Sequence, residues 1–326
     1  MGSRRVSRAT TGTRSLDTGR IVGWTRDNGV YVAFAVLVLF NAIFTTNFAT
    51  TATLFNLLIQ VAPVLIVSLG MALVIGTEGI DLSVGSVMAI ASAIVPLYMG
   101  YGWPVAVLIA LVVGTLAGAL NGGLVAFVGM QPIIATLALF VGGRGLAQVL
   151  VGGQLQIISD PTFLALGQAE VLGIPLPVII AGVLALIVGF VVRRTTFGRY
   201  VLAIGGNRAA SYLSGHPVRA VLVAVYAISA ALATVAGVLA TARLSAGDPS
   251  TIGILIELDA IAAVVVGGTP LSGGKVSVAG TVMGAMVMAV ITATFIMNDL
   301  PFTYAQILKA VIILIAVYIQ RGRGSV

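Results

Sequence analysis

The side chains that could carry out chemistry are scarce in this sequence. Its 326 residues include ten acidic residues, one histidine (His216) and no cysteine. Without cysteine the chain cannot form a disulfide, a thiolate metal site or a thiol nucleophile, and one histidine cannot build a multi-histidine metal centre. We therefore expect this chain to have no catalytic site and to bind no metal or cofactor.

A glycine-rich segment, 267–275, superficially resembles a phosphate-binding loop. Such a loop needs the spacing G-x4-G-K-[ST], so that backbone N–H groups and the lysine surround the phosphates. Here Thr269 stands where the first glycine is needed, and Val276 follows Lys275 where a hydroxyl should bind magnesium. We therefore expect that this chain does not hydrolyse ATP itself.

Two of the ten acidic residues, Glu78 and Asp81, lie between two apolar stretches in the segment 77–85. An aspartate at the centre of a membrane helix costs about 2.5–3.5 kcal/mol on insertion scales. Gly79 and Gly85 permit a break in the backbone, and Ser83 can cap the helix that follows. The segment is either a broken helix beside a transport pathway or a solvated turn at the membrane surface.

Other polar side chains interrupt the apolar stretches. Asn56 and Gln60 lie one turn apart on one helix face, as do Arg144 and Gln148. Such groups could bind the hydroxyls of a polyhydroxylated solute, or they could form hydrogen bonds between helices. As candidates for a substrate pathway we name Asn56, Gln60, Glu78, Asp81, Ser83, Asn121, Gln131, Thr136, Arg144 and Gln148.

Glycines recur at every fourth position in one apolar stretch, at Gly114, Gly118 and Gly122. Small residues at this spacing let two membrane helices approach closely. This pattern predicts helix packing rather than ligand contact.

The composition indicates where these residues must lie. Apolar residues make up 59% of the chain and charged residues 8%, against about 25% charged residues in soluble domains, and the mean hydropathy is +1.13. A soluble fold of this size could not cover so much hydrocarbon, and a disordered chain needs high charge and low hydrophobicity. The apolar residues form continuous runs, which argues against a porin-like barrel. The predicted fold class is an all-α polytopic membrane protein.

The lengths of the apolar runs predict the number of spans. A helix needs about 20 residues to cross the hydrocarbon core. We predict about ten transmembrane helices, of which the third and eighth are short enough to be broken helices lining the pathway. The stretches are 30–46, 54–76, 84–99, 104–128, 132–151, 176–192, 219–242, 255–268, 276–297 and 303–320.

The basic residues predict the orientation. The net charge is +7, but most of the 17 Lys and Arg residues lie in the tail 1–27 or in alternate loops, which is not a nucleic-acid footprint. The positive-inside rule places both termini and the loop 193–218 in the cytoplasm. We therefore divide the chain into a basic cytoplasmic tail, 1–27, and a single transmembrane domain, 28–326. Lys309 is expected to extend its ammonium toward the membrane surface.

The cytoplasmic loop 193–218 contains a predicted short helix. Asn207 can cap a helix over 208–214, which Gly215 and Pro217 then end. A short polar helix on the cytoplasmic face suits docking to a soluble partner, although the loop could also serve only to anchor the topology.

Three segments together resemble the permease subunits of ABC importers for pentoses and hexoses, the ribose type. They are Gly-Ile-Asp-Leu-Ser-Val-Gly at 79–85, Thr-Phe-Gly-Arg and Ala-Ile-Gly-Gly-Asn within 196–207, and Leu-Asp-Ala-Ile-Ala-Ala-Val-Val-Val-Gly-Gly with Leu-Ser-Gly-Gly over 258–274. Their order and spacing match over roughly residues 50–320. The runs 143–148 and 257–259 resemble one subunit of the galactofuranose-type system, which pairs two non-identical permeases.

The resemblance implies a function and partners. The chain would be a permease subunit for monosaccharide import in the bacterial inner membrane, and two cytoplasmic ABC ATPases would use ATP and Mg. A second copy or a related permease would complete the pore, and a periplasmic or lipid-tethered sugar-binding protein would deliver the sugar. The alternative is a secondary transporter or facilitator that works alone, for which Glu78 and Asp81 would be the candidate intramembrane acids.

The resemblance also implies a contact with the ATPase, within residues 196–215. The segment 196–215 resembles the Glu-Ala-Ala loop of other importers, although Arg208 takes the place of the glutamate. The residues implied for coupling to the ATPase are Phe197, Gly198, Arg199, Asn207, Arg208, Ala209, Ala210 and Gly215.

Overall fold

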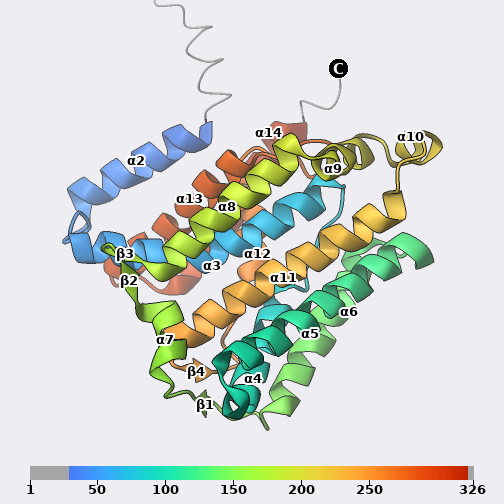
Figure 1. Ribbon diagram of the computed structural model, residues 1–326. Helices are drawn as coiled ribbons and strands as arrows, with labels where there is room; N and C mark the ends of the chain where they lie inside the picture. The colour runs from blue at the N-terminus through green and yellow to red at the C-terminus, as the bar shows by residue number, and fades with distance from the viewer. Residues whose placement is uncertain (1–28, 322–326) are drawn as a thin grey trace, which may run out of the picture.

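The computed structural model describes residues 29–321, so the predicted tail 1–27 lies outside the described residues. The described chain is almost entirely helical, and each predicted apolar stretch contains a helix (Figure 1). These helices are α2 (Gly29–Phe44), α3 (Thr51–Gly76), α4 (Val84–Tyr98), α5 (Trp103–Gly123), α6 (Pro132–Leu150), α8 (Leu176–Arg194), α11 (Val218–Leu244), α12 (Ile256–Val266), α13 (Val278–Met297) and α14 (Phe302–Arg321).

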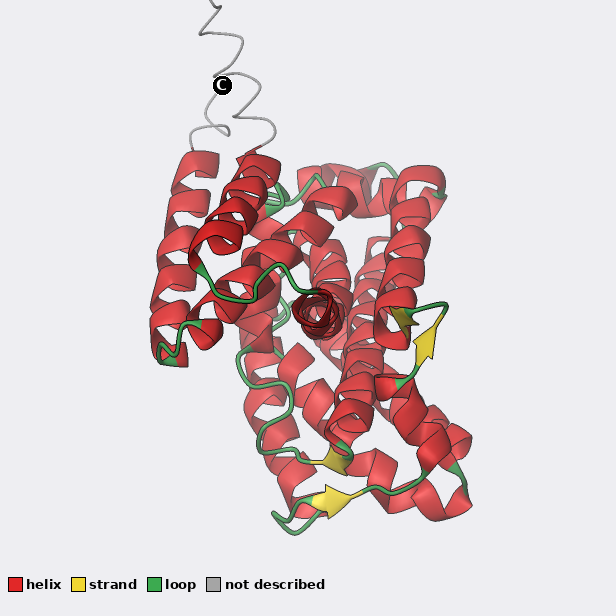
Figure 2. Ribbon diagram, turned by 90° about the vertical axis from the view of Figure 1, so that its left-hand side faces the viewer, coloured by secondary structure: helices red, strands yellow, loops and turns green. Residues whose placement is uncertain are grey.

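Shorter elements connect these helices, and the strands are confined to the edge of the molecule (Figure 2). A 3₁₀ turn, η1 (Met99–Tyr101), extends α4, and a π-helical turn, η2 (Leu124–Val128), extends α5. The short helices are α7 (Pro161–Gln168), α9 (Thr196–Gly206) and α10 (Arg208–Leu213). Strand β1 (Gln156–Ile157) pairs antiparallel with β4 (Ala246–Gly247), and β2 (Glu170–Val171) pairs with β3 (Ile174–Pro175).

Seven helices within residues 29–321 are long and apolar enough to cross a membrane. They are α3, α4 with η1, α5 with η2, α6, α8, α11 and α13. The apolar helices α2 and α14 are shorter, and α12 has only 11 residues. At 1.5 Å per residue α12 is about 16 Å long, roughly half of a bilayer core. The structure confirms a polytopic helical membrane protein, whereas ten crossings and their orientation stay predictions.

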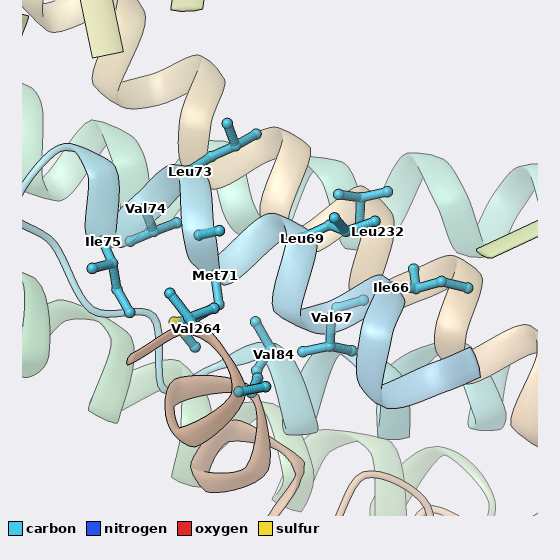
Figure 3. Close-up of a cluster of buried hydrophobic side chains, with 14 of the residues drawn as sticks. Ile66, Val67, Leu69, Met71, Leu73, Val74, Ile75, Val84, Leu232 and Val264 are labelled. Carbon is cyan, nitrogen blue, oxygen red and sulfur yellow. The ribbon is translucent and has the colours of Figure 1, made fainter. Parts of the chain in front are cut away.

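Helix α3 lies at the centre of the molecule because it is apolar on every side. Its second half is completely buried, with Ile66, Leu69 and Ile75 at 0% exposure. Figure 3 shows these side chains meeting Val84 of α4, Leu232 of α11 and Val264 of α12. In contrast, α5, α6 and α8 leave most of their apolar side chains at least partly exposed, as expected for apolar helices at the outside of a membrane protein.

The predicted glycine contact is confirmed between α5 and α11. A Cβ atom on Gly114 would collide with Thr234, one on Gly118 with the backbone of Tyr226, and one on Gly122 would lie 2.7 Å from Val223 Cα. Only glycine allows the two helices to approach this closely.

Elements with different predicted locations lie at opposite ends of the molecule (Figure 1). The start of α2, the end of α14, α9 and α10 gather at the upper side, whereas α7, β1 and β4 lie at the lower side. The two ends of the described chain therefore lie on the same side as the loop 193–218, while the orientation across a membrane stays a prediction. Helix α7 is capped by the Asp160 side chain, which accepts hydrogen bonds from the backbone N–H groups of Thr162 (2.9 Å) and Phe163 (3.2 Å). Hydrogen bonds from the Thr162 side chain and the helix start lower the pKa of Asp160 below its usual value.

Candidate functional site

Asp81 is buried in the middle of the helices rather than in a solvated turn. Its side chain is in the break between α3 and α4, and the residue is 1% exposed. Oδ1 accepts hydrogen bonds from the backbone N–H (3.0 Å) and the hydroxyl (2.6 Å) of Ser83. Oδ2 accepts one from the hydroxyl of Ser229 (2.9 Å), near the middle of the long helix α11. The link between α3 and α4 is therefore buried rather than solvated at Asp81, and its place beside a transport pathway stays a prediction.

The prediction that Ser83 caps α4 is wrong. Ser83 occupies the N-cap position, but its hydroxyl makes no capping hydrogen bond. It donates instead to Asp81 and accepts a hydrogen bond from the Asn121 amide of α5 (3.0 Å), because the buried carboxylate is a stronger acceptor. We call Asp81, Ser83, Asn121 and Ser229 the Asp81 cluster. It joins the α3–α4 link to α5 and α11.

Two residues of α11 at this site were missed by the sequence analysis. Ser229 belongs to the Asp81 cluster, and the buried Tyr226 hydroxyl has no hydrogen-bond partner among the described residues. A Cβ atom on Gly79 would lie 2.6 Å from the Tyr226 oxygen, so the link passes directly over it. A single serine or tyrosine in an apolar stretch carries little signal on its own.

Arg144 of α6 fixes a second contact between distant segments. Its guanidinium donates hydrogen bonds to the backbone oxygens of Pro249 (2.8 Å), Ile252 (3.2 Å) and Gly85 (3.3 Å). It therefore ties the segment before α12 to the start of α4. A Cβ atom at Gly85 would lie 2.6 Å from Oε2 of Glu257, an oxygen with no partner among the described residues.

The expectation that Lys309 extends to the membrane surface is wrong. Its ammonium lies 2.8 Å from Oδ1 and 2.9 Å from Oδ2 of Asp259, and its side chain is 7% exposed. The carboxylate lies within reach in the first turn of α12, so pairing replaces extension to the surface. Besides the candidate acids Glu78 and Asp81, the acids Glu257 and Asp259 also lie among the apolar helices, in the first turn of α12.

The structure brings some of the predicted pathway residues together and leaves others apart. Asp81, Ser83 and Asn121 belong to the Asp81 cluster. Thr136 donates toward the backbone oxygen of Ile80 (3.4 Å), and Arg144 holds the start of α4. The remaining candidates lie away from the cluster: Asn56, Glu78 and Gln131 are exposed, and Gln60 and Gln148 are half-buried.

The loop 193–218 folds as two short helices. Asn207 caps α10 through a hydrogen bond from Ala210 N–H to its Oδ1 (2.9 Å), and Gly215 follows with φ +77°. The helix spans 208–213, close to the predicted 208–214. The exposed residues of the predicted coupling set are Arg199, Asn207, Arg208, Ala209, Ala210 and Gly215.

Two residues of the predicted coupling set face inward. Phe197 is half-buried, and Gly198 is buried against the backbone oxygens of Val191 and Val192. Gly198 therefore shapes the corner between α8 and α9 and presents no surface to a partner.

Over residues 29–321 no group of three or more His, Cys, Asp or Glu side chains could hold a metal ion.

Comparison with known proteins shows close relatives among sugar permeases. The chain is 38% identical to a ribose import permease of Haemophilus influenzae, over 90% of this chain and 93% of that protein. It is 37% identical to a galactofuranose transporter permease of Escherichia coli (82% and 79%) and 40% identical to a fructose import permease of Bifidobacterium longum (81% and 79%). Identity alone does not select one of these sugars.

The match extends over most of the membrane domain. No solved structure matches the chain significantly. One protein family matches residues 53–317, and its description is the permease component of the branched-chain amino acid transport system. The matched residues run from near the start of α3 nearly to the end of α14. The chain belongs to this family of transport-system permeases.

Proposed function

We propose that the chain is the permease subunit of an ATP-driven monosaccharide importer in the bacterial inner membrane. The observation that carries the proposal is that ribose, galactofuranose and fructose import permeases each align over 81–90% of the chain. The substrate is a pentose or hexose, with galactofuranose among the candidates. The tail 1–27 and both termini lie in the cytoplasm, and the rest of the chain forms one transmembrane domain.

ATP hydrolysis belongs to a separate subunit in this proposal. The chain lacks the spacing of a phosphate loop and binds no cofactor itself, so ATP and Mg act on an ABC ATPase partner. A second copy or a related permease completes the pore, and a periplasmic or lipid-tethered binding protein supplies the sugar. Because the binding protein provides affinity, the permease needs only weak sugar contacts.

The exposed surface of α10 is the proposed contact with the ATPase. Arg208, Ala209 and Ala210 are exposed there, and Leu213 at the end of the helix is 87% exposed. Asn207 caps the short helix, and Ser211 on its inner side is buried. An apolar side chain this exposed beside basic residues suits a groove on a soluble partner.

The proposed sugar pathway follows α6. Arg144 and Gln148 on this helix are half-buried, and Gln131 just before it is exposed. Thr136 of the same helix and the Asp81 cluster are buried. Amide and guanidinium groups donate hydrogen bonds to sugar hydroxyls. Asn56 and Gln60 lie in the first half of α3, whose start is at the other end of the molecule from α9 (Figure 1), and Glu78 lies exposed in the link after α3.

The first experiment is purification of the tagged chain in mild detergent, with mass spectrometry of the proteins that copurify. We expect an ATPase with Walker motifs. A second, different permease would identify a heteromeric pore. A stable, homogeneous chain purified alone would contradict the proposal and favour a self-sufficient carrier.

The contact with the ATPase is tested by replacing Arg208, Ala209 and Ala210 with glutamate. We expect loss of ATPase binding and of sugar uptake, with normal membrane insertion. The control is Leu172→Glu, which adds a charge to a 97% exposed position in the turn between β2 and β3, before the start of α8. Unchanged sugar uptake in the triple variant would contradict the assignment of α10.

A further inference from the structure

Three glycines from distant segments meet at the side of the molecule where α9 lies. They are Gly76 at the end of α3, Gly205 near the end of α9, and Gly274 in the link 267–277 between α12 and α13. The backbone N–H of Gly274 donates a hydrogen bond to the backbone oxygen of Gly76 (3.1 Å). A Cβ atom on Gly205 would collide with both of these atoms. We call Gly76, Gly205 and Gly274 the glycine junction.

The junction connects α9 to both breaks in the membrane helices. Directly after Gly76 comes the link 77–83, which ends at the Asp81 cluster. Gly274 belongs to the second link, where a Cβ atom on Gly273 (φ +74°) would lie 2.8 Å from the backbone nitrogen of Glu78. The two links therefore touch each other as well as α9.

Contacts at the junction are between backbone atoms, which have no rotamers to absorb a displacement. Helix α9 turns one buried face toward them, with Val201 and Ile204 at 0% exposure. Close-packed interiors transmit strain because neighbouring groups cannot be compressed. A shift of α9 must consequently move both links or break the junction.

We propose that the glycine junction is the joint through which motion of α9 and α10 reaches the two broken helices, with Gly205 as its positioning residue. The inference rests on the proposed function, since it assumes that α10 is driven by an ATPase. The inference adds the place where the movement enters the membrane domain. This place is the link carrying Asp81 together with the link after α12, and not the length of α8 or α11.

The chain offers a matched pair of variants for the test. Gly205→Ala places a methyl group against two backbone atoms, whereas a Cβ atom on the adjacent Gly206 meets nothing within 4 Å. Both residues lie at the end of α9, so the change in helix propensity is similar. The complex is reconstituted in liposomes with the sugar-loaded binding protein. Bound ATPase subunit, ATP hydrolysis with and without binding protein, and sugar uptake are then measured.

We expect Gly205→Ala to keep the ATPase subunit bound and to keep basal ATP hydrolysis. Uptake and the stimulation of hydrolysis by binding protein should fall by about tenfold or more, a usual size for a coupling effect. Gly206→Ala should behave as wild type. Normal uptake in Gly205→Ala, or an equal loss in Gly206→Ala, would overturn the joint.

A second variant pair tests the same joint if Gly205→Ala does not assemble. A Cβ atom on Gly76 would collide with Cγ2 of Val276 and lie 3.1 Å from Cγ1 of Val201, both of which are side-chain atoms. Gly76→Ala should therefore lower uptake, and Val276→Ala in the same chain should restore it by removing the colliding methyl. Failure of this rescue would overturn the joint.

The proposed function fails in a different way. A wild-type complex that shows no ATP-dependent sugar uptake would refute the proposed function and the joint with it. A wild-type complex that imports sugar, with Gly205→Ala importing equally well, refutes only the joint.

Discussion

Replacement of Asp81 by alanine should destabilise the membrane domain strongly. The carboxylate accepts hydrogen bonds from Ser83 N–H, Ser83 Oγ and Ser229 Oγ at 2.6–3.0 Å, and the residue is 1% exposed. The two hydroxyls can rotate toward other acceptors, but the backbone N–H of Ser83 cannot. An unsatisfied buried donor costs about 1–3 kcal/mol, and hydrogen bonds to a charged group contribute about 1.5–3 kcal/mol each.

These contributions are opposed by the removal of a buried charge, which favours the variant. We therefore expect Asp81→Ala to lower the free energy of unfolding by about 2–4 kcal/mol. Asp81→Asn keeps one oxygen acceptor for Ser83, and its amide can donate to the rotated hydroxyl of Ser229. For Asp81→Asn we expect a loss of about 1 kcal/mol.

Glu78→Ala is the control, because Glu78 lies in the same link but is exposed. Glu78 has φ +65°, and alanine keeps the same Cβ, so the backbone strain does not change. We expect a change within about 0.5 kcal/mol. The assay is equilibrium unfolding by SDS in mixed micelles, followed by the loss of helical circular dichroism. If Asp81→Ala unfolds at the same SDS fraction as Glu78→Ala, the structural role assigned to the carboxylate is wrong.

Three further predictions follow from other contacts. Lys309→Met should lower the free energy of unfolding in the same assay by about 3–5 kcal/mol, because it leaves Asp259 unpaired. The double variant Lys309→Met with Asp259→Leu should recover most of this loss. Equal losses in the single and the double variant would argue against the ion pair. Gly118→Leu should separate α5 from α11 and lower the yield of folded protein in size-exclusion chromatography. Gly123→Leu, at a position open to a side chain, should not lower this yield. Equal yields from the two variants would refute the packing role of Gly118. Asn121→Leu should reduce sugar uptake without loss of assembly, and wild-type uptake would assign Asn121 to packing alone.

Much of the fold could be predicted from the sequence because bilayer thickness and backbone hydrogen bonding leave little choice. Continuous apolar runs predicted the positions of the helices, and the small residues of α5 predicted a close helix contact, although not that its partner is α11. Asn207 and Gly215 bounded α10 nearly correctly, since capping is a local property. The stretch 255–268 also matched α12 to within two residues, but 11 helical residues are too few to cross the hydrocarbon core, so a crossing there stays a prediction.

The site could be predicted only in part because its contacts join segments distant in sequence. Ser83 has the right position for an N-cap, yet its hydroxyl bonds Asp81 and Asn121, which local rules cannot anticipate. Lys309 meets Asp259 across 50 residues of sequence, and no local pattern indicates that pairing. Where a polar group in an apolar helix finds its partner depends on how the helices pack.

The same contacts limit which polar groups a chain with 8% charged residues can present to a sugar. Most buried polar side chains have their hydrogen bonds filled within the protein and are not free to bind a solute. Among the residues described, two oxygens next to the helix breaks lack a partner: the Tyr226 hydroxyl beside Gly79 and Oε2 of Glu257 beside Gly85. Both face the backbone between α3 and the first turn of α4, which the glycine junction ties to α9. Movement of that backbone would change what these two oxygens contact, while the fully bonded groups around them would hold the helices in place.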